Sequence, residues 1–470
     1  MTFGEIIGKI DGFVWGWPLI IMLVGTHLFM TFRTGFIQKD IFKAIKMSFE
    51  KDPDAEGDVS QFGALTTALS STIGTGNIIG VTSAIVLGGP GALFWMWITA
   101  IIGGASAYVE STLAQIYKKR DLDGTSYGGP AYYMANALGQ RWLGVIFSVI
   151  IILTYAVGYN MLAAYNLQST FKAFSFYSNA TPIVIGIILA VLFGIIVIGG
   201  AKRLINVTGV MVPVMGVIYV AVAIIVLIIN IKNIPAMFGM IFESAFDFKA
   251  IFGGFAGSCI MNGIKRGLYS NEAGMGSAPN AAAKADVSHP AKQGLVQMLS
   301  VFLDTLLICT ATGFMVLSSG IGVTEEMKAD AALYVQGALG ESLGAFGPIF
   351  ICVAMCLFAF TTLIGNYSYC EGCLDFIANK KVEGAGLKLF RIVATILIFV
   401  GTIASAGMVW NIADMLQGFM VVINVPVIII LMKPAMAALE DYVAQKKAGK
   451  DPHFVAKEVG LDDSQMDFWK

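Results

Sequence analysis

The stretch SSTIGTGNIIG, Ser70 to Gly80, lies inside a long apolar segment and decides which kind of fold the chain adopts. Three glycines, several hydroxyls and the amide of Asn77 stand where a membrane helix normally carries leucine and alanine. Glycine costs a helix about 1 kcal/mol relative to alanine. In lipid, an unwound turn also leaves backbone N–H and C=O groups without water, so it persists only inside protein or beside a polar cavity. The pattern therefore predicts a membrane-spanning helix that is interrupted near its centre.

A second interruption follows in the C-terminal half, at GLYSNEAGMG, Gly267 to Gly276. It places Ser270, Asn271 and Glu272 next to small residues at the expected depth of the membrane centre, where an ionisable side chain is costly and is functional by default. Secondary transporters build their sites from interrupted helices, whose N-terminal ends face an anion while freed carbonyls hold a cation. Paired breaks therefore predict a solute transporter. A channel is the nearest alternative, but it does not need glycine breaks in both halves.

The composition agrees with a membrane protein. The chain has 470 residues, of which 57% are hydrophobic and 13% charged, and its mean hydropathy is +0.76. Apolar runs long enough to cross a hydrocarbon core of about 30 Å recur throughout. Cys370 and Cys373 form a CxxC, which we interpret as two small helix-packing residues. The three histidines and six cysteines form no clustered Cys/His set, which disfavours a redox or metal enzyme. No basic stretch with interleaved aromatic residues indicates nucleic acid. We expect an all-α polytopic membrane protein that is not an enzyme.

Apolar runs bounded by Gly, Pro and charged residues predict eleven membrane spans. They lie near residues 12–34, 62–88, 90–118, 141–170, 181–200, 208–230, 250–281, 292–319, 345–375, 386–405 and 408–433. Lys and Arg concentrate in the loops that alternate spans place on one side. By the positive-inside rule, this arrangement predicts a multi-pass protein of the cell membrane with its N-terminus outside and its C-terminus in the cytoplasm.

Setting the first span aside leaves two groups of five, at residues 62–230 and 250–433, and each group opens with an interrupted helix. Because five is an odd number, the second group must enter the membrane from the opposite side. This is the inverted-repeat plan of leucine-transporter-like carriers. Residues 1–61 would then hold an N-terminal helix and a cytoplasmic loop, and residues 434–470 a charged cytoplasmic tail. We also expect short surface helices in four loops, at 35–61, 119–140, 231–249 and 320–344.

The first break offers groups of both polarities. Unwinding around Ile73 to Gly76 would free the carbonyls of Ser70 to Ile73, which suit a hard cation. It would also free the N–H groups of Thr75 to Asn77, which begin the next half-helix and suit a carboxylate. The Asn77 side chain either adds an oxygen ligand or caps that half-helix.

Glu272 in the second break has three interpretations: it compensates a substrate ammonium group, carries a coupling proton, or pairs with Lys265 or Arg266. An ion pair between Arg266 and Asp414 near the outer side is a further hypothesis. We expect the other acidic residues of the apolar runs to be interfacial or structurally paired; these are Glu110, Asp304, Glu371 and Asp375.

Two other spans offer polar side chains. Thr361 and Thr362 in FAFTTLIGN either bond back to their own helix or face the first break as cation ligands. The fourth span carries polar residues that we expect to line a cavity, namely Tyr155, Tyr159, Asn160 and Asn166.

The sixteen residues GGPGALFWMWITAIIG, Gly88 to Gly103, resemble the signature of the alanine or glycine:cation symporter family, the sodium:alanine symporters. STIGTGNIIG and SNEAGMGSAPNAAAKAD, Ser270 to Asp286, are similar to the same family. The resemblance implies uptake of alanine and glycine driven by sodium, or in some members by protons, on the leucine-transporter-like fold. The implied partners are a small neutral amino acid and membrane lipid, and the oligomeric state stays open.

The resemblance also implies roles for residues. Thr72 and Asn77 would border one cation position, and Gly74 to Gly76 would hold the substrate carboxylate. The second break would hold the substrate ammonium. The implied second cation position comprises Ser70, Ile73, Phe358, Thr361 and Thr362. Together with Tyr159, which we expect at the substrate because the fourth span lines the cavity, the expected substrate contacts are Ile73, Gly74, Thr75, Gly76, Asn77, Ser270, Asn271, Glu272, Ala273 and Gly274.

Overall fold

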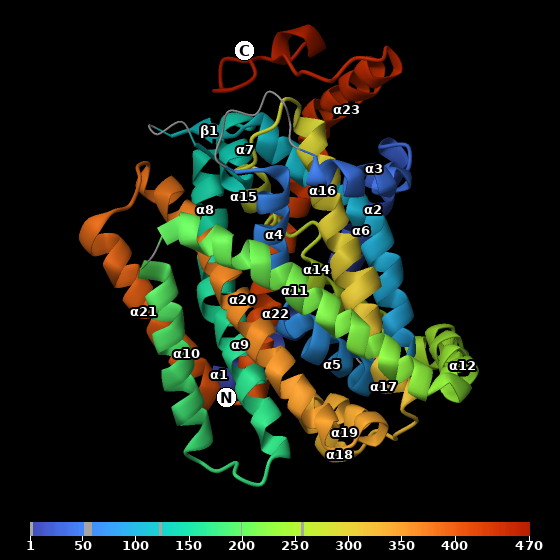
Figure 1. Ribbon diagram of the computed structural model, residues 1–470. Coiled ribbons are helices and arrows are strands. Elements are labelled where there is room, and N and C mark those ends of the chain that lie inside the picture. The colour runs from blue at the N-terminus through green and yellow to red at the C-terminus, as the bar shows by residue number, and fades with distance from the viewer. Residues whose placement is uncertain (1–2, 51–58, 122–124, 199, 255–257) are drawn as a thin grey trace.

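The computed structural model describes residues 3–50, 59–121, 125–198, 200–254 and 258–470. Long helices run side by side through its length, and the two chain termini lie toward opposite ends (Figure 1). One two-stranded antiparallel hairpin, β1 (Lys119–Arg120) and β2 (Ser126–Tyr127), interrupts the helical pattern. It lies at the end of the molecule that carries the C-terminal tail, residues 448–470, which we call the tail end (Figure 1).

Among the described residues, eight helices are long and apolar enough to cross a membrane, and two bent pairs raise the number to as many as ten. The eight are Gly91–Ile116 (α6), Arg141–Ala173 (α8, η3, α9 and η4), Thr181–Ile198 (α10), Val207–Ile229 (within α11), Pro290–Ser318 (α16, η7 and α17), Phe346–Ala378 (α20), Gly384–Ile403 (α21) and Ala406–Ile430 (α22). Each coincides with a predicted span. The all-α polytopic class is therefore confirmed.

The second bent pair falls on the predicted span 62–88, and α2 (Trp17–Arg33) of the first pair falls on the predicted span 12–34, whereas α1 (Phe3–Val14) lies almost entirely before that span and was not predicted. The helices α1 and α2 meet at 47°. The helix α4 (Gln61–Thr72) and the segment Gly76–Gly88, which contains η2 and α5, meet at 52°. The remaining predicted span, 250–281, contains α13 (Phe248–Gly253), α14 (Cys259–Asn271) and α15 (Pro279–Ala282), and residues 255–257 lie outside the described part of the chain.

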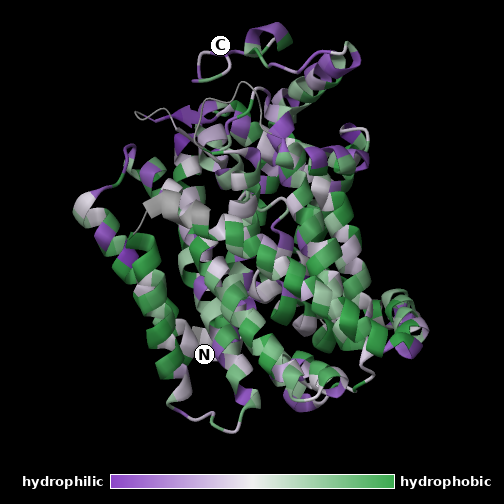
Figure 2. Ribbon diagram, in the orientation of Figure 1, coloured by the Kyte–Doolittle hydropathy of each residue, from purple (hydrophilic) through white to green (hydrophobic). Residues whose placement is uncertain are grey.

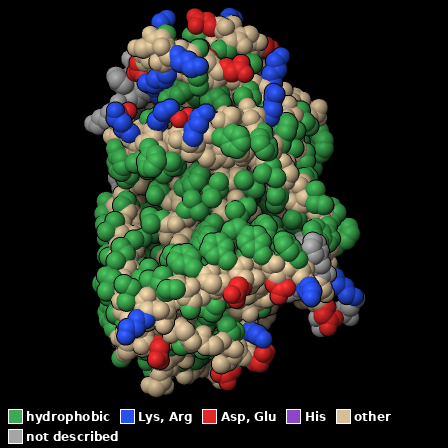
Figure 3. Space-filling model, turned by 90° about the vertical axis from the view of Figure 1, so that its right-hand side faces the viewer, with side chains coloured by type: hydrophobic (Ala, Val, Ile, Leu, Met, Phe, Trp, Pro, Cys, Tyr) green, Lys and Arg blue, Asp and Glu red, His purple; other side chains and the backbone are tan. Residues whose placement is uncertain are grey.

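In the view of Figure 2, the helices are mostly hydrophobic through the middle of the molecule and more hydrophilic toward its two ends. In the view of Figure 3, charged side chains gather above and below a band of hydrophobic ones. The helix α10 shows the cause, since its mean hydropathy is 3.0 while only 22% of that segment is buried. Side chains such as Ile187 and Val191 are more than half exposed. An exposed face of that composition is stable in lipid and not in water.

The loops expected to carry short helices do so. These helices are α3 (Ile41–Phe49), α7 (Pro130–Asn136), α12 (Ile234–Ala245), α18 (Glu325–Ala329) and α19 (Ala331–Leu343). The last helix, α23 (Met432–Lys447), leads into the tail, which packs on the tail end through Phe454, Met466 and Trp469. Short 3₁₀ turns occupy Ile37–Asp40, Thr170–Ala173, Ile231–Asn233 and Ala456–Val459.

Both predicted interruptions are present. The helix α4 begins at the serine cap Ser60 and ends at Thr72, and Ile73 leaves the helical conformation with ψ at 89°. The helix α14 begins at the serine cap Ser258 and ends where Glu272 adopts φ 60°, in the left-handed region. The glycines that follow at 274 and 276 also have positive φ, which only glycine adopts readily.

Three spans contain a π-helical segment: η2 (Gly76–Gly80), η3 (Leu153–Tyr159) and η7 (Phe302–Cys309). Such segments are rare and occur frequently at functional sites. The segment η2 packs against both η7 and α14, so the irregular backbone of several helices converges at one place.

Candidate functional site

The two breaks lie against each other. Ser71 Oγ is 3.1 Å from Glu272 Oε1, and Thr75 Oγ1 is 3.0 Å from the hydroxyl of Tyr269. A Cβ added to Gly76 would lie 3.1 Å from the Tyr269 ring and 3.3 Å from the Ser270 backbone. A larger residue here would press on Tyr269 and Ser270, so the glycine allows the two breaks to pack closely.

Glu272 does not pair with a basic residue. Its carboxylate is buried and accepts a hydrogen bond from Ser277 Oγ at 2.6 Å, in addition to its contact with Ser71. Lys265 and Arg266 turn instead toward Asp414. The interpretation of Glu272 as a partner of Lys265 or Arg266 is therefore wrong. Because α14 ends at Glu272, the chain turns there, and the glutamate faces away from the basic pair that precedes it.

Asn77 closes the first break on itself. Its Oδ1 accepts the Gly74 N–H at 2.7 Å, so the capping interpretation of this side chain is observed. Its amide nitrogen donates to Asp304 at 2.6 Å to Oδ1 and 3.2 Å to the main-chain oxygen. The Gly74 N–H, which we expected to face a substrate carboxylate, is thus occupied in this conformation.

Asp304 is a functional candidate that the sequence analysis missed. It is fully buried within η7, and Thr305 Oγ1 donates to its Oδ2 at 2.9 Å. Asn271 Nδ2 donates to that threonine hydroxyl at 3.0 Å. The expectation of an interfacial or paired residue is wrong here, because its contacts are neutral side chains around the first break. The signal was its position in the middle of an apolar run. We call Asn77, Ser270, Asn271, Asp304 and Thr305 the Asp304 cluster.

Glu110 is likewise not interfacial. It is fully buried in α6, and its two carboxylate oxygens accept the N–H groups of Gly274 at 3.2 Å and Gly276 at 3.1 Å. Asn424 Nδ2 donates to it at 2.9 Å, and the Tyr133 hydroxyl donates to Asn424 at 2.6 Å. Glu110 thereby satisfies backbone donors that the second break leaves free, which a membrane interior requires.

The hydroxyl residues expected at the two cation positions divide into two groups. The hydroxyls of Thr361, Thr72 and Ser70 hydrogen-bond to carbonyls of their own helices, Thr361 to Leu357 and Phe358 among them. Thr362 differs. Its buried hydroxyl has no hydrogen-bond partner within the described chain, and it closely approaches the position of a Cβ on Gly74. Of the two adjacent threonines, Thr362 is the one that faces the first break.

Helix residues of the fourth span reach the same region, as expected for a lining helix. The Tyr159 hydroxyl donates to Gln417 at 3.0 Å, and its ring packs edge-on against Tyr269 at 4.9 Å between centroids. Asn160 accepts a hydrogen bond from Asn366 at 2.9 Å, and Asn366 Oδ1 lies 2.7 Å from Ser71 Oγ.

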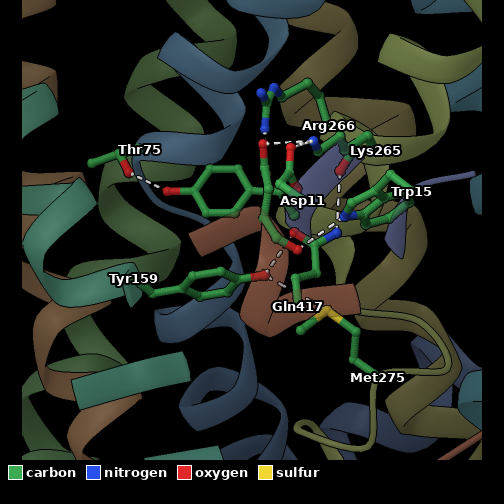
Figure 4. Close-up of polar contacts among 10 residues, drawn as sticks. Asp11, Trp15, Thr75, Tyr159, Lys265, Arg266, Met275 and Gln417 are labelled. Atoms are coloured by element: carbon green, nitrogen blue, oxygen red, sulfur yellow. Dashed lines mark hydrogen bonds and ion pairs between the residues drawn. The ribbon is translucent and has the colours of Figure 1, made fainter. Parts of the chain in front are cut away.

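A buried ion cluster lies beside the second break (Figure 4). Arg266 meets Asp414 at 2.6 Å, which confirms the geometry of the hypothesised pair, and Lys265 bridges Asp414 at 3.0 Å and Asp11 at 2.8 Å. Gln417 donates to the main-chain oxygen of Lys265 at 3.2 Å and accepts from the Tyr159 hydroxyl, so it links the backbone at Lys265 to Tyr159. The contribution of Asp11 from α1 was not expected.

The donors around the first break are carboxylate, amide and hydroxyl oxygens. Among the residues that the structure describes, no group of three or more His, Cys, Asp or Glu side chains is placed to hold a metal ion. Oxygen donors with few charges suit a hard monovalent cation better than a transition metal. Buried carboxylates, such as Asp304 and Glu272, and a main-chain N–H group, that of Gly74, thus lie close together between the two interrupted helices.

The fold and this site define a class of membrane transporter. The structure is similar to the crystal structure of MhsT in complex with L-phenylalanine, with a TM-score of 0.53, 14% sequence identity, and coverage of 87% of this chain and 94% of that one. This similarity establishes the leucine-transporter-like fold. The sodium:alanine symporter family model matches residues 1–456, and the chain belongs to that family. It is thus an amino-acid transporter of the membrane and not an enzyme.

Individual relatives are similar over nearly their whole length. The amino-acid carrier protein AlsT of Bacillus subtilis is 42% identical, with coverage of 98% of this chain and 97% of the relative. The probable sodium/glutamine symporter GlnT of the same species is 40% identical, covering 99% and 96%. The sodium/alanine symporter AgcS of Methanococcus maripaludis is 40% identical, covering 90% and 94%.

Proposed function

We propose that the protein imports a small neutral amino acid, alanine or glycine, together with a sodium ion by alternating access. The observation that carries this proposal is the meeting of the two breaks at Ser71 and Glu272. A zwitterion needs a donor for its carboxylate and an acceptor for its ammonium, and both kinds of group lie at this contact. Movement of one broken helix against the other would open the site to one side at a time.

Glu272 is the proposed partner of the substrate ammonium. A buried carboxylate is costly unless a cation or several donors compensate it. Its contacts in the structure are the neutral hydroxyls of Ser71 and Ser277. The N–H groups of Thr75 and Gly76, at the start of the second half-helix, are the proposed partners of the substrate carboxylate. Tight packing of Gly76 against Tyr269 favours a substrate with a small side chain.

Asp304 and Asn77 are the proposed ligands of the coupling cation. The two side chains lie within hydrogen-bond distance, and a cation would take the place of the amide N–H that now faces the carboxylate. Thr362 is the proposed contributor of a hydroxyl near Gly74, whereas Thr361, Thr72, Ser70, Ile73 and Phe358 stay predictions from the family resemblance. A membrane potential of about 100 mV supplies about 2.3 kcal/mol per charge moved inward.

The orientation is part of the proposal. Placing most Lys and Arg in the cytoplasm puts the tail end inside and the N-terminus outside. The inverted repeats at 62–230 and 250–433 likewise stay predictions. Two alternatives follow from the comparisons and the sequence. The relative GlnT, named for sodium and glutamine, makes glutamine a competing substrate. Buried carboxylates without a basic partner, such as Glu272, make a proton the competing coupling ion.

The test is uptake into proteoliposomes of labelled alanine, glycine and glutamine, with sodium and proton gradients imposed separately. We expect alanine and glycine to accumulate under an inward sodium gradient without a proton gradient. Accumulation of glutamine alone would overturn the substrate assignment. Accumulation only under a proton gradient would overturn the sodium assignment. Single-channel currents in a planar bilayer would overturn the carrier mechanism altogether.

A further inference from the structure

A line of buried polar side chains runs from Asp304, at the start of η7 (Phe302–Cys309), along α16 (Pro290–Val301) toward the tail end. Gln293, Gln297, Ser300 and Asp304 are each at most 1% exposed. Their spacing of four, three and four residues places them on one face of a helix. We call these four residues the α16 polar line.

The α16 polar line begins at the proposed cation site. At the end of the line nearest the two breaks, Asp304 contacts Asn77 of the first break. The helix α16 also packs along α4, the first half of that interrupted helix. Eleven residues of helix span about 16 Å, which is about half the thickness of a hydrocarbon core. Gln293, at the other end of the line, lies one turn after His289, the cap of α16, whose ring packs against Phe454 of the C-terminal tail.

Several amide atoms of the α16 polar line have no hydrogen-bond partner in the described part of the protein. Both amide atoms of Gln293 and Oε1 of Gln297 have no hydrogen-bond partner in the described parts of the chain. On the neighbouring helix α6, Gln115 donates to the carbonyls of Ala282 and Ala285 while its own Oε1 has no partner. A buried polar atom left unpaired costs about 1–3 kcal/mol. In protein interiors, such atoms are usually satisfied by buried water.

We propose that the α16 polar line is a hydrated path along which the coupling cation passes between Asp304 and the tail end. This inference rests on the proposed function, which supplies the coupling cation. The new content is the route of that cation and the residues that line the route. Glutamine amides neither gain nor lose protons at neutral pH, so a relay of titrating groups is not supplied here. Their carbonyl oxygens can instead replace part of the hydration shell of a cation, as in channels.

The main test replaces Gln297 by leucine in the full-length protein. Leucine fills a similar volume but offers no oxygen. Reconstituted protein is assayed for sodium-dependent alanine binding and for inward flux of labelled sodium and alanine, with flux expressed per binding site. We expect binding to persist and flux per site to fall about tenfold or more, equivalent to an added barrier of about 1.4 kcal/mol. Flux per site equal to that of the unmodified protein overturns the path.

Two further variants make the assignment specific. Gln336 of α19 (Ala331–Leu343) is also buried, with an unpartnered Oε1, but lies off the α16 polar line. We expect Gln336→Leu to keep its flux per binding site, and an equal loss there would overturn the inference by showing a general effect of removing buried amides. Gln297→Asn keeps an amide on the line and is expected to keep most of the flux that Gln297→Leu loses.

A measurement of thiol accessibility tests the hydrated path even if Gln297→Leu does not fold. Gln297→Cys and Val296→Cys introduce thiols on adjacent residues that are both fully buried, one on the α16 polar line and one beside it. A cationic, membrane-impermeant thiol reagent is added from the tail end, and the unmodified protein gives the background of its own cysteines. We expect faster reaction at position 297. Equal rates at the two positions overturn a hydrated path.

The outcomes also separate this inference from the proposed function. If the unmodified protein shows neither sodium-dependent alanine binding nor uptake, the proposed function fails. If the unmodified protein binds and transports while Gln297→Leu transports equally well, only the path fails.

Discussion

Ser71 Oγ lies 3.1 Å from Glu272 Oε1, although 201 residues separate the two in the sequence. This contact joins the first half of one interrupted helix to the end of the first half of the other. A second contact, between Thr75 and Tyr269, joins the second half of the first interrupted helix to the first half of the second. Each break is therefore stabilised by the other, and a rearrangement of one changes the partners of polar groups in both.

Asp304→Asn is expected to raise the sodium concentration for half-maximal alanine uptake about tenfold or more, because losing a charged ligand of a buried cation costs at least about 1.4 kcal/mol. Asn77→Ala is expected to act in the same direction, since it removes both the oxygen and the partner of Asp304. Sodium titrations of initial uptake rates check both. The control is Asp40→Asn, which removes only a surface pair with Lys43. Sodium titrations unchanged in both variants would remove the cation assignment.

Glu272→Gln separates the two remaining interpretations of this residue. Glutamine keeps one acceptor oxygen, for either Ser71 or Ser277, places an NH2 group at the other position, and loses the negative charge. We expect a higher alanine concentration for half-maximal uptake, because the substrate ammonium loses its counter-charge, while sodium-driven uptake persists at saturating alanine. Uptake rates measured at several alanine concentrations give the result. Complete loss of sodium-driven uptake, with substrate binding intact, would instead indicate a proton relay.

Gly74→Ala is expected to abolish uptake, because the added methyl group would overlap the Thr362 hydroxyl. Thr362→Ala removes that oxygen, so the double variant Gly74→Ala/Thr362→Ala should bind alanine better than Gly74→Ala alone. Binding and thermal stability in detergent, measured for both single variants and the double variant, form a double-mutant cycle. Strictly additive losses would show that the two residues do not share the same space.

Acidification is expected to loosen the C-terminal tail. The His289 ring packs against Phe454 of the tail and Tyr442 of α23, and burial lowers its pKa from 6.5 to about 4. Released His289 gains a proton as the pH falls below 6.5, whereas docked His289 stays neutral until about pH 4. Docking is therefore constant above pH 6.5 and weakens between pH 6.5 and 4.

Three charged or titratable groups face this histidine. Asp441, 3.2 Å away on α23, favours protonation, whereas Lys292 of α16 and His453 of the tail oppose it. Limited proteolysis of the tail across this pH range measures docking. In His289→Phe, which keeps an aromatic ring and cannot be protonated, the dependence should be much smaller. A tail cleaved equally fast at pH 7 and pH 5 in the unmodified protein would contradict the expectation.

Some site residues were predictable because a local rule points to them. Glycine inside an apolar segment marks a break whatever the rest of the chain does, so Gly74, Gly76 and Gly274 could be identified from the sequence. Asp304 had an equally clear local signal, an acidic residue in the middle of an apolar span, but its partners in the first break could not be inferred from that position. Glu110 carried a weaker signal, because its role depends on backbone donors of a distant segment.

The direction in which a side chain points could not be predicted from the sequence. Thr361 and Thr362 are adjacent and chemically identical, yet one bonds to its own helix and the other faces Gly74. Only the rotation of α20 about its axis distinguishes them, and packing against neighbouring helices sets that rotation. The same holds for Lys265 and Arg266, whose partners Asp11 and Asp414 come from helices at the two ends of the chain.

The sequence by itself determined that this chain is a bundle of membrane helices with two interrupted members, because the cost of burying unpaired backbone in lipid acts on each segment separately. It also carried the family resemblance. Tertiary structure alone decided which polar groups share a site, since Ser71 meets Glu272 and Asn77 meets Asp304 only after helices far apart in the chain pack together. A contact between distant segments depends on the relative position and rotation of both helices, and no local pattern encodes either.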